Sequence, residues 1–312
     1  MNAAIFGIKP VAGNWTKNLI ANTGGGVPIA RDIAYSGSAY MSVGVTSVSY
    51  NFFTATDPTS TWTQRTPSTV LGIPTGVVSN GSRFVVVSRP NGSGTGGILY
   101  TDDDGATWAN VSSFGSEWNA LCYGNALFVA VSSTTAAATS TDGASWTART
   151  LSFADARSVW YGNGLYVAVG GAGAIATSPD GVTWTNRTSG TAIDLYCVRY
   201  KAGVWLAVGY DGGGNSVALT SFDGITWATQ TLPVGMTYAS EIGVFKNWFI
   251  VGSDITTGTM YKSISGLTGG WTATGSATGS TAAIVSNAPL LVRWYTESAG
   301  GGGTDYGVYT SS

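Results

Sequence analysis

Residues 156–188 read ARSVWYGNGLYVAVGGAGAIATSPDGVTWTNRT, and residues 118–150 repeat the same unit as WNALCYGNALFVAVSSTTAAATSTDGASWTART. Each copy holds four short runs rich in β-branched and aromatic residues, separated by turns of Gly, Asn and Asp. In the first copy the predicted strands cover residues 158–161, 165–170, 174–178 and 183–188. Four short strands joined by tight turns predict one antiparallel four-stranded sheet per unit.

Seven tryptophans extend this unit along the whole chain, each at the start of a predicted fourth strand: Trp15, Trp62, Trp108, Trp146, Trp184, Trp227 and Trp271. The successive differences between these positions are 47, 46, 38, 38, 43 and 44 residues. Such a period matches one blade of a β-propeller and exceeds a leucine-rich or ankyrin repeat. We therefore expect a single toroidal domain.

The two ends of the chain predict how the ring closes. Trp15 has too few residues before it for three strands, whereas the segment after Trp271 has no further fourth strand. Residues 281–312 contain three strand-like runs, which the segment around Trp15 could complete without leaving an open edge. We expect an all-β, seven-bladed propeller of four-stranded antiparallel blades over residues 14–312, with N- and C-terminal strands paired in one composite blade.

A surplus segment remains at the N-terminus. Residues 3–10 also resemble a strand, so either this segment or the C-terminal run at 305–311 lies outside the ring. Residues 1–13 are therefore a candidate attachment arm. Neither end resembles a signal peptide, and no apolar run approaches the length of a membrane span, so we expect no membrane insertion.

Composition excludes several functional classes. Only 10% of residues are charged, the formal net charge is −2, and histidine is absent. A nucleic-acid partner is not expected from such a chain, and no imidazole can serve as base or zinc ligand. Cys122 and Cys197 fall on inner strands of separate blades and are expected to be buried thiols. We expect neither a cofactor nor a bound metal.

A repeated turn joins the third and fourth strands. It reads SPDGVTW at 178–184, STDGASW at 140–146, SFDGITW at 221–227 and, in a longer form, TDDDGATW at 101–108. The longer form fits the Asp-box pattern, and the other three are similar to it with one residue deleted. The chain thus resembles Asp-box β-propellers, an architecture shared by sialidases, sortilin-type receptors and photosystem assembly factors.

The four box aspartates, Asp103, Asp142, Asp180 and Asp223, are interpreted as structural. A carboxylate in this turn can accept backbone N–H groups, the glycine supplies a positive φ, and the tryptophan packs between blades. A calcium site at residues 102–104 would need further acidic ligands that the sequence lacks. The box turns lie together on one face of the ring, and this face is not expected to bind a ligand.

Ligand binding is expected on the opposite face, where the starts of the inner strands and the loops after the second strands vary. The candidate ligand-binding residues there are Arg31, Asp32, Trp118, Asn119, Arg157, Asp194, Tyr196, Tyr210, Asp211, Glu241 and Tyr295. Such aromatic and polar groups are suited to a sugar, by stacking and by hydrogen bonds. Arg293 also differs from the equivalent second-strand position of other repeats, where Ala130, Ala168 and Ala207 stand.

An enzymatic role is not expected. Resemblance to sialidases implies three arginines that bind a substrate carboxylate, a tyrosine nucleophile with a glutamate partner, and an acidic catalyst. Residues 27–33, VPIARDI, lack the context of the first such arginine. Arg65, Arg149 and Arg187 each follow one of the seven repeat tryptophans by three residues and are interpreted as structural.

The repeat also resembles propellers of bacteriophage tail and virion adhesion proteins. That resemblance implies a non-enzymatic virion protein or tail fibre that binds a host glycan or receptor, contacts other virion proteins and acts in multiple copies. The alternative is a secreted bacterial lectin or an assembly-factor propeller, which places the protein outside the cell. A sialidase-like glycosidase is the least favoured reading.

Overall fold

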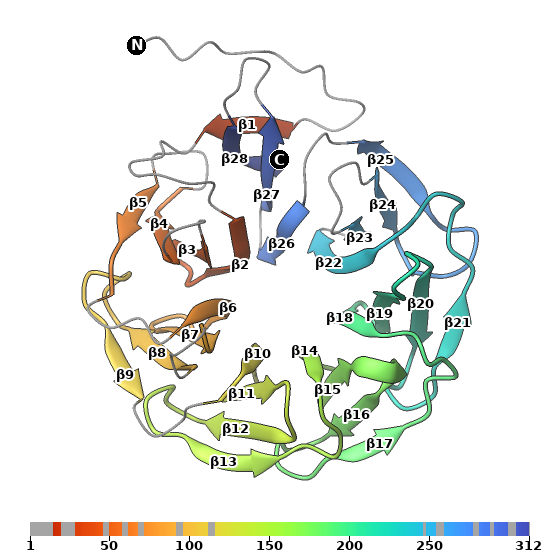
Figure 1. Cartoon of the computed structure of the whole chain (residues 1–312), viewed down its shortest axis with the longest axis horizontal. Coiled ribbons are helices and arrows are strands. Elements are labelled where there is room, and N and C mark those ends of the chain that lie inside the picture. The colour runs from red at the N-terminus through yellow and green to blue at the C-terminus, as the bar shows by residue number, and fades with distance from the viewer. Residues whose placement is uncertain are drawn as a thin grey trace.

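The strands of the computed structural model form a ring around a central opening (Figure 1). The structure describes residues 15–19, 29–45, 50–57, 62–67, 72–91, 96–111, 116–245, 248–253, 259–276, 281–287, 290–298 and 304–311. For residues 15–19, 29–30, 51, 245, 253, 259–260 and those from 274 onward, only the backbone is described. The proposed arm at residues 1–13 lies outside the described residues.

Seven four-stranded antiparallel sheets make up the ring. The first three sheets of consecutive strands comprise β2 (Ile29–Tyr35), β3 (Tyr40–Val45), β4 (Tyr50–Ala55) and β5 (Thr63–Arg65); β6 (Ile73–Ser79), β7 (Phe84–Arg89), β8 (Gly97–Thr101) and β9 (Ala109–Val111); and β10 (Trp118–Gly124), β11 (Leu127–Ser132), β12 (Ala136–Ser140) and β13 (Thr147–Thr150). In each of them the first strand lies nearest the opening and the fourth lies outermost (Figure 1).

The next three sheets follow the same order. They comprise β14 (Ala156–Gly162), β15 (Leu165–Gly170), β16 (Ile175–Ser178) and β17 (Thr185–Arg187); β18 (Leu195–Lys201), β19 (Val204–Tyr210), β20 (Ser216–Ser221) and β21 (Ala228–Gln230); and β22 (Ala239–Phe245), β23 (Trp248–Ser253), β24 (Thr259–Ser263) and β25 (Thr272–Ser276). A single 3₁₀ turn, η1 (Gly171–Gly173), joins β15 to β16 within this part of the chain.

The last sheet joins the two ends of the chain. Its order is β1 (Trp15–Leu19), β28 (Thr304–Ser311), β27 (Leu290–Ser298) and β26 (Thr281–Asn287), and Trp15 pairs with Ser311. The predicted seven-bladed propeller is therefore corrected to a ring with six blades of consecutive strands. The remaining four strands form one sheet across the chain ends, of which only the backbone is described.

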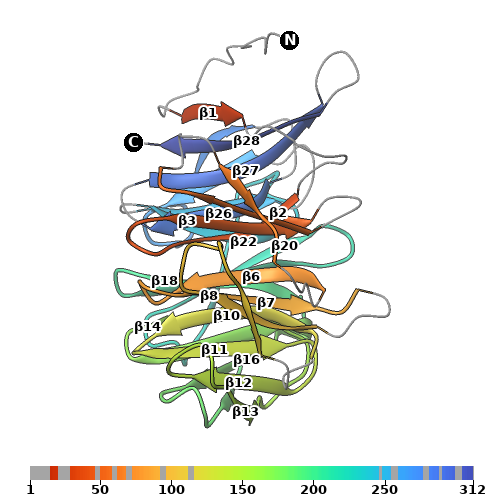
Figure 2. The ribbon, with the colours of Figure 1, turned by 90° about the vertical axis from the view of Figure 1, so that its left-hand side faces the viewer.

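Strand composition follows position within a blade. The second strands are buried almost throughout, as in LFVAVS of β11 and LYVAVG of β15, because both of their faces pack against neighbouring blades. The fourth strands, such as TART of β13, are largely exposed. Figure 2 shows the strands running across the thickness of the disc, from one face to the other.

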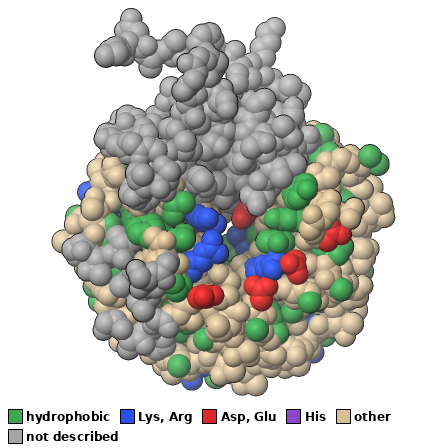
Figure 3. Space-filling view, viewed as in Figure 1, with side chains coloured by type: hydrophobic (Ala, Val, Ile, Leu, Met, Phe, Trp, Pro, Cys, Tyr) green, Lys and Arg blue, Asp and Glu red, His purple; other side chains and the backbone are tan. Residues whose placement is uncertain are grey.

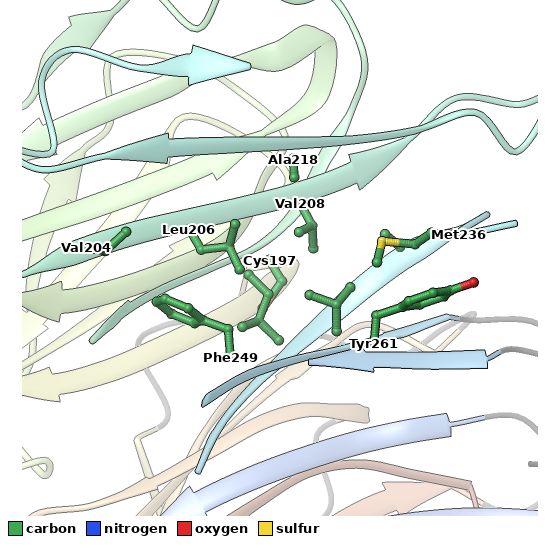
Figure 4. Close-up of a cluster of buried hydrophobic side chains, with 11 residues drawn as sticks. Cys197, Val204, Leu206, Val208, Ala218, Met236, Phe249 and Tyr261 are labelled. Atoms are coloured by element: carbon green, nitrogen blue, oxygen red, sulfur yellow. The ribbon is translucent and has the colours of Figure 1, made fainter. Parts of the chain in front are cut away.

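The hydrophobic core is divided among the contacts between adjacent blades. One cluster joins Leu206 and Val208 of β19 to Phe249 of β23 and Tyr261 of β24 (Figure 4). Cys197 lies in the same cluster and Cys122 in another, and both are buried free thiols as predicted. Stability of the ring is therefore spread over many separate inter-blade contacts rather than one central core.

Two glycines permit close contact between inner strands. A Cβ atom on Gly124 would lie 2.3 Å from the Tyr161 ring of the next blade, and one on Gly162 would lie 2.4 Å from Tyr200 Cβ. The tyrosine of each following blade thus occupies the space that a side chain would need. These contacts set how closely consecutive blades approach around the opening.

The box turns are built as hydrogen-bonded units. Asp180 Oδ1 accepts the backbone N–H groups of Val182 at 2.8 Å and Thr183 at 2.9 Å, and Asp142 and Asp223 repeat this pattern. In the longer turn, Asp103 accepts from the backbone and the hydroxyl of Thr107. These bonds hold the pKa values of Asp103, Asp142 and Asp223 at about 2.

Arginines of the fourth strands make one repeated bond. The Nε atoms of Arg65, Arg149 and Arg187 donate to the hydroxyls of Thr54, Thr139 and Thr177, at 2.8, 3.1 and 2.9 Å. Each bond joins a fourth strand to the third strand of its own blade. These three arginines therefore serve the blade and do not converge on a ligand.

Candidate functional site

Every inner strand carries a β-bulge at the same depth. In β14, Ala156 pairs with Gly170 and Ser158 with Val169, so Arg157 between them has no partner on β15. The same interruption occurs in the other six inner strands. The residues left outside the pairing are Arg31, Thr75, Asn119, Arg157, Tyr196, Ser240 and Ala282, and we call them the bulge ring.

A bulge bends the strand and redirects one side chain, which is why bulges recur beside binding sites. Here the backbone device is the same in each blade, but the residue it presents differs. Four of the predicted candidates belong to this ring: Arg31, Asn119, Arg157 and Tyr196. On the face shown in Figure 3, acidic and basic side chains gather around the central opening.

Two bulge residues connect one blade to the next. Thr75 Oγ1 donates to the backbone oxygen of Trp118 at 2.7 Å, and Asn119 Nδ2 donates to that of Ala156 at 2.9 Å. Both acceptors directly precede the bulge residue of the following blade. Thr75 and Asn119 therefore help to fix the spacing between inner strands.

Arg157 makes a different contact because it is clamped by two carboxylates. Its Nη2 atom lies 2.7 Å from Asp155 Oδ2, and its Nη1 atom lies 2.8 Å from Asp194 Oδ2 on the following blade. Burial alone would lower the pKa of Arg157, but the hydrogen bond and charge of Asp155, with Tyr196 and Asp194, outweigh it and raise the pKa. The guanidinium is charged and fixed in place.

Three tyrosines continue from this guanidinium. Its carbon lies 4.4 Å from the ring centre of Tyr196, which stacks on Tyr210 at 4.4 Å with an interplanar angle of 7°. Tyr210 meets Tyr238 edge-on at 5.2 Å and 62°. We call Arg157, Tyr196, Tyr210 and Tyr238 the Arg–Tyr column. It spans β14, β18, the end of β19 and the residue before β22.

Strained backbone supports both ends of the column. Asp155 and Tyr238 have φ values of 61° and 55°, a region that bulky L-residues seldom occupy. Asp155 is held there by bonds from its N–H to Ser133 O and from Gly171 N–H to its own oxygen. Positive φ also occurs at Asn125 and Asn163 in hairpin turns, so at Asp155 and Tyr238 it shows a backbone that surrounding contacts hold in place and not a function by itself.

The loop between β19 and β20 supports Tyr238. Asp211 accepts the backbone N–H groups of Gly213 and Asn215, each at 2.9 Å, and the side chain of Asn215. Gly214 O in turn accepts the N–H of Tyr238 at 3.3 Å. The predicted ligand residue Asp211 thus shapes its own loop, and the Asn215 bonds lower its pKa.

A second charged group lines the opening more deeply. Asp32 accepts the backbone N–H groups of Ile33 and, from the next blade, Val77, both at 2.9 Å. Burial raises its pKa to about 6, although those bonds and the charge of Arg199 act in the opposite direction. Arg199 donates to Val198 O at 2.8 Å and lies over the Trp160 ring.

A shallow groove of about 540 Å³ lies in the blade that carries Arg157, although no residue of the column lines it. Its walls are Phe153, residues 172–175 from η1 to the start of β16, and residues 186–192, which lead from β17 toward Asp194. Ala172, one of the lining residues, donates its N–H to Asp194 Oδ1 at 2.8 Å. The groove and the carboxylate clamp therefore share one backbone segment.

The remaining predicted residues lie apart from the column. Trp118 packs in the core at 1% exposure, so its ring offers no surface to a ligand, contrary to its choice as a candidate. Glu241 lies on β22 and Arg31 on β2. Tyr295 is on β27, where it pairs with Thr281 and Gly307, but its side chain is outside the described residues, as is that of Arg293.

Sequence reasoning missed Tyr238 and Thr75. Tyr238 lies in a segment without repeat pattern, so only the structure shows that it meets Tyr210. Thr75 was detectable in principle, because it aligns with Asn119 and Arg157 at the inner-strand starts.

No helix among the described residues is long and apolar enough to cross a bilayer. The described residues also hold no His, Cys, Asp and Glu group arranged to bind a metal.

Comparison with known proteins shows the fold and leaves the family open. No protein-family model matches the chain, and no curated protein matches it. Among solved structures, YCF48 bound to D1 peptide has a TM-score of 0.67 at 17% identity, over 97% of this chain and 98% of that one. YCF48 from Cyanidioschyzon merolae has a TM-score of 0.63 at 15% identity, over 96% and 98%.

A GH74 xyloglucanase from Xanthomonas campestris is similar over a smaller part, with a TM-score of 0.60 at 14% identity, over 85% of this chain and 50% of that one. At such identities, likeness establishes a β-propeller fold resembling YCF48 and GH74 propellers. None of these three structures is a bacteriophage adhesion protein. The phage role favoured by the sequence therefore has no support among them.

Proposed function

We propose that the protein is a non-enzymatic binding propeller of the assembly-factor type, which holds a segment of a partner protein on its bulge-ring face. The observation that carries this proposal is the Arg–Tyr column, a fixed polar and aromatic surface built on bulged strands. The likeness to YCF48 supports it, because that similarity covers nearly the full length of both chains and one YCF48 structure contains a bound peptide.

The chemistry of the column favours binding over catalysis. Asp155 and Asp194 both contact the single guanidinium of Arg157, at 2.7 and 2.8 Å, so these three charged groups are directed at one another. The Asp32 carboxylate accepts two backbone N–H groups, and the box aspartates serve the turns of the other face.

The groove in the blade of Arg157 favours an extended chain as the ligand. Its volume lies within the range of ordinary ligand sites, and Gly, Ala, Ser and Thr line most of it. These small side chains leave room for the backbone of an extended peptide to approach.

The test is selection from a random peptide display library against the purified protein. Peptides that bind reproducibly are then measured against Arg157→Ala and Tyr196→Ala, with Phe222→Ser as matched control. Phe222 is 66% exposed in the box turn between β20 and β21, on the other face. We expect binding to weaken by about tenfold or more in the first two variants, since both alter the column, and to persist in the control.

A glycan array serves as the second arm, because stacked tyrosines also suit a sugar. Glycan binding that depends on Tyr196, without peptide binding, would replace the peptide proposal with the lectin alternative. Absence of selective binding in both arms would contradict the proposal, as would peptide binding that Phe222→Ser abolishes and Arg157→Ala leaves intact.

A further inference from the structure

We propose that the Arg–Tyr column receives an aromatic side chain of the partner segment, stacked on the face of the Arg157 guanidinium opposite Tyr196. This inference rests on the proposed function and specifies the ligand chemistry of the same site. It follows from which edges and faces of the planar Arg157 guanidinium already contact other groups.

The edges of the guanidinium face carboxylates. Nε and Nη2 donate to Asp155 Oδ2 at 3.2 and 2.7 Å, and Nη1 is ion-paired with Asp194 Oδ2 at 2.8 Å, although the geometry there does not make a hydrogen bond. An incoming carboxylate or phosphate would have to displace one of these partners. The clamp also carries two negative charges against one positive charge, which disfavours an anionic ligand.

The faces of the guanidinium offer the remaining contact. Tyr196 covers one face, and within the described part of the chain no second ring lies over the other. The Arg157 side chain is 22% exposed, so part of it meets solvent. Because guanidinium groups stack on aromatic rings by both cation–π and planar contact, an aromatic side chain would extend the column by one more layer.

The Arg157 side chain is held in one orientation before a ligand binds. Asp155 and Asp194 pair with its guanidinium, and Tyr196, which stacks on Tyr210, covers one of its faces. Little side-chain entropy is therefore lost when a ligand ring docks. Asp155 and Asp194 remain 44% and 37% exposed, so a basic residue next to the ligand aromatic would also be attracted.

The experiment uses three small probes on the whole protein: N-acetyl-tryptophanamide, N-acetyl-tyrosinamide and N-acetyl-leucinamide. The Arg157 Nε–H resonance is followed by NMR during titration with each probe. We expect a ring-current shift with both aromatic amides, and affinity for the tryptophan probe about fivefold to tenfold above that for the leucine probe. The shift identifies the stacked face as the contact.

Three variants separate stacking from charge and from the tyrosine hydroxyl. Arg157→Lys keeps the charge and removes the plane, so it should abolish the preference for aromatic probes. Tyr196→Phe keeps the supporting ring and should retain that preference, whereas Tyr196→Ala should lose it. In Arg157→Lys the Nε–H resonance of residue 157 is absent, so probe binding is read from the saturation-transfer signal of the probe itself.

Equal affinity for the leucine and tryptophan probes would overturn the inference, as would an aromatic preference that survives Arg157→Lys. Display peptides separate this failure from failure of the proposed function. Selected peptides that bind through the column but lack aromatic residues would leave the binding propeller standing and refute the stacked ring. Absence of any selected peptide would count against the proposed function itself.

Discussion

The two faces of the ring differ in which feature recurs from blade to blade. On the box-turn face, the side chains themselves recur, since Asp142, Asp180 and Asp223 each accept N–H groups two and three residues ahead. On the bulge-ring face, the backbone interruption recurs in every sheet while the presented side chain changes from blade to blade.

This difference separates folding from recognition within one repeat. A side chain that recurs in the same bonds serves a need common to all blades, such as closing a hairpin. A position that is geometrically constant and chemically free can vary without loss of the blade. Changes to the recurring box side chains should therefore cost the most stability, whereas changes on the bulge-ring face should have smaller effects on stability that depend on the blade.

The largest effect is expected from Trp146→Ala on the box-turn side. Trp146 is 9% exposed, packs with Phe128 and Val85, and donates Nε1–H to Gly143 O at 2.9 Å. Its removal should lower the free energy of unfolding by about 3–5 kcal/mol. Chemical denaturation measures this loss, with Trp146→Phe as a control that keeps a ring. A loss below about 1 kcal/mol would contradict the structural role of the box.

The faces should also respond oppositely to pH. The pKa of Asp32 is raised from its unfolded value to about 6, so its ionisation costs stability as pH rises from about 4 to 6. The cost at neutral pH is about 2–3 kcal/mol. Box aspartates with pKa values of about 2 behave in reverse, because their contribution is complete above pH 4 and is lost as pH falls from 4 toward 2.

Unfolding free energies measured between pH 3 and 7 test both signs. We expect the wild-type protein to gain stability as pH falls from 7 toward 4, before the acid loss begins. In Asp32→Asn that gain should be missing while the acid limb remains. An unchanged slope in the variant would remove Asp32 as its source.

A pair of glycine substitutions compares the faces with backbone strain held similar. Gly214 and Gly203 have φ values of 82° and 89°, but a Cβ on Gly214 would lie 2.6 Å from the Tyr238 ring, and one on Gly203 would meet nothing within 4 Å. Gly203→Ala should cost about 1 kcal/mol from strain. Gly214→Ala should cost about 2–3 kcal/mol and change the near-ultraviolet circular dichroism of the tyrosines.

The smallest effect concerns Thr75, which joins two blades on the bulge-ring face. Thr75→Val keeps the shape and removes the 2.7 Å bond to Trp118 O, so we expect a loss of about 1 kcal/mol. Thr226→Val is the matched control, since it removes an exposed 3.2 Å contact with Asp223 Oδ2. Its effect should be no more than about 0.5 kcal/mol by chemical denaturation. Equal losses would mean that Thr75 does not stabilise the blade contact.

Much of the blade could be predicted from sequence because its signals are local. The predicted strand at 165–170 coincides with β15, and the box turns show the expected carboxylate bonds. Those features depend on residues within one hairpin, where turn chemistry and strand pattern act together.

The site was predicted only in fragments because its contacts join different blades. Arg157, Asp194, Tyr196 and Tyr210 were identified individually, but nothing in their spacing shows that they stack or pair. Trp118 was selected for its place at a strand start, and burial against the neighbouring blade decided otherwise. The bulge itself leaves no residue signature, since Arg, Thr, Asn, Tyr and Ser all occupy it.

The pairing of β1 with β28 has a consequence for synthesis of the protein. Strand β1 emerges from the ribosome first among the described strands, but its hydrogen-bonding partner emerges last. Six blades can form from consecutive strands as the chain grows, whereas β1 must wait for β28 with its polar edge unsatisfied. Closure of the disc must therefore follow synthesis of all the strands between β1 and β28, and the time before closure is when a chaperone would have most to protect.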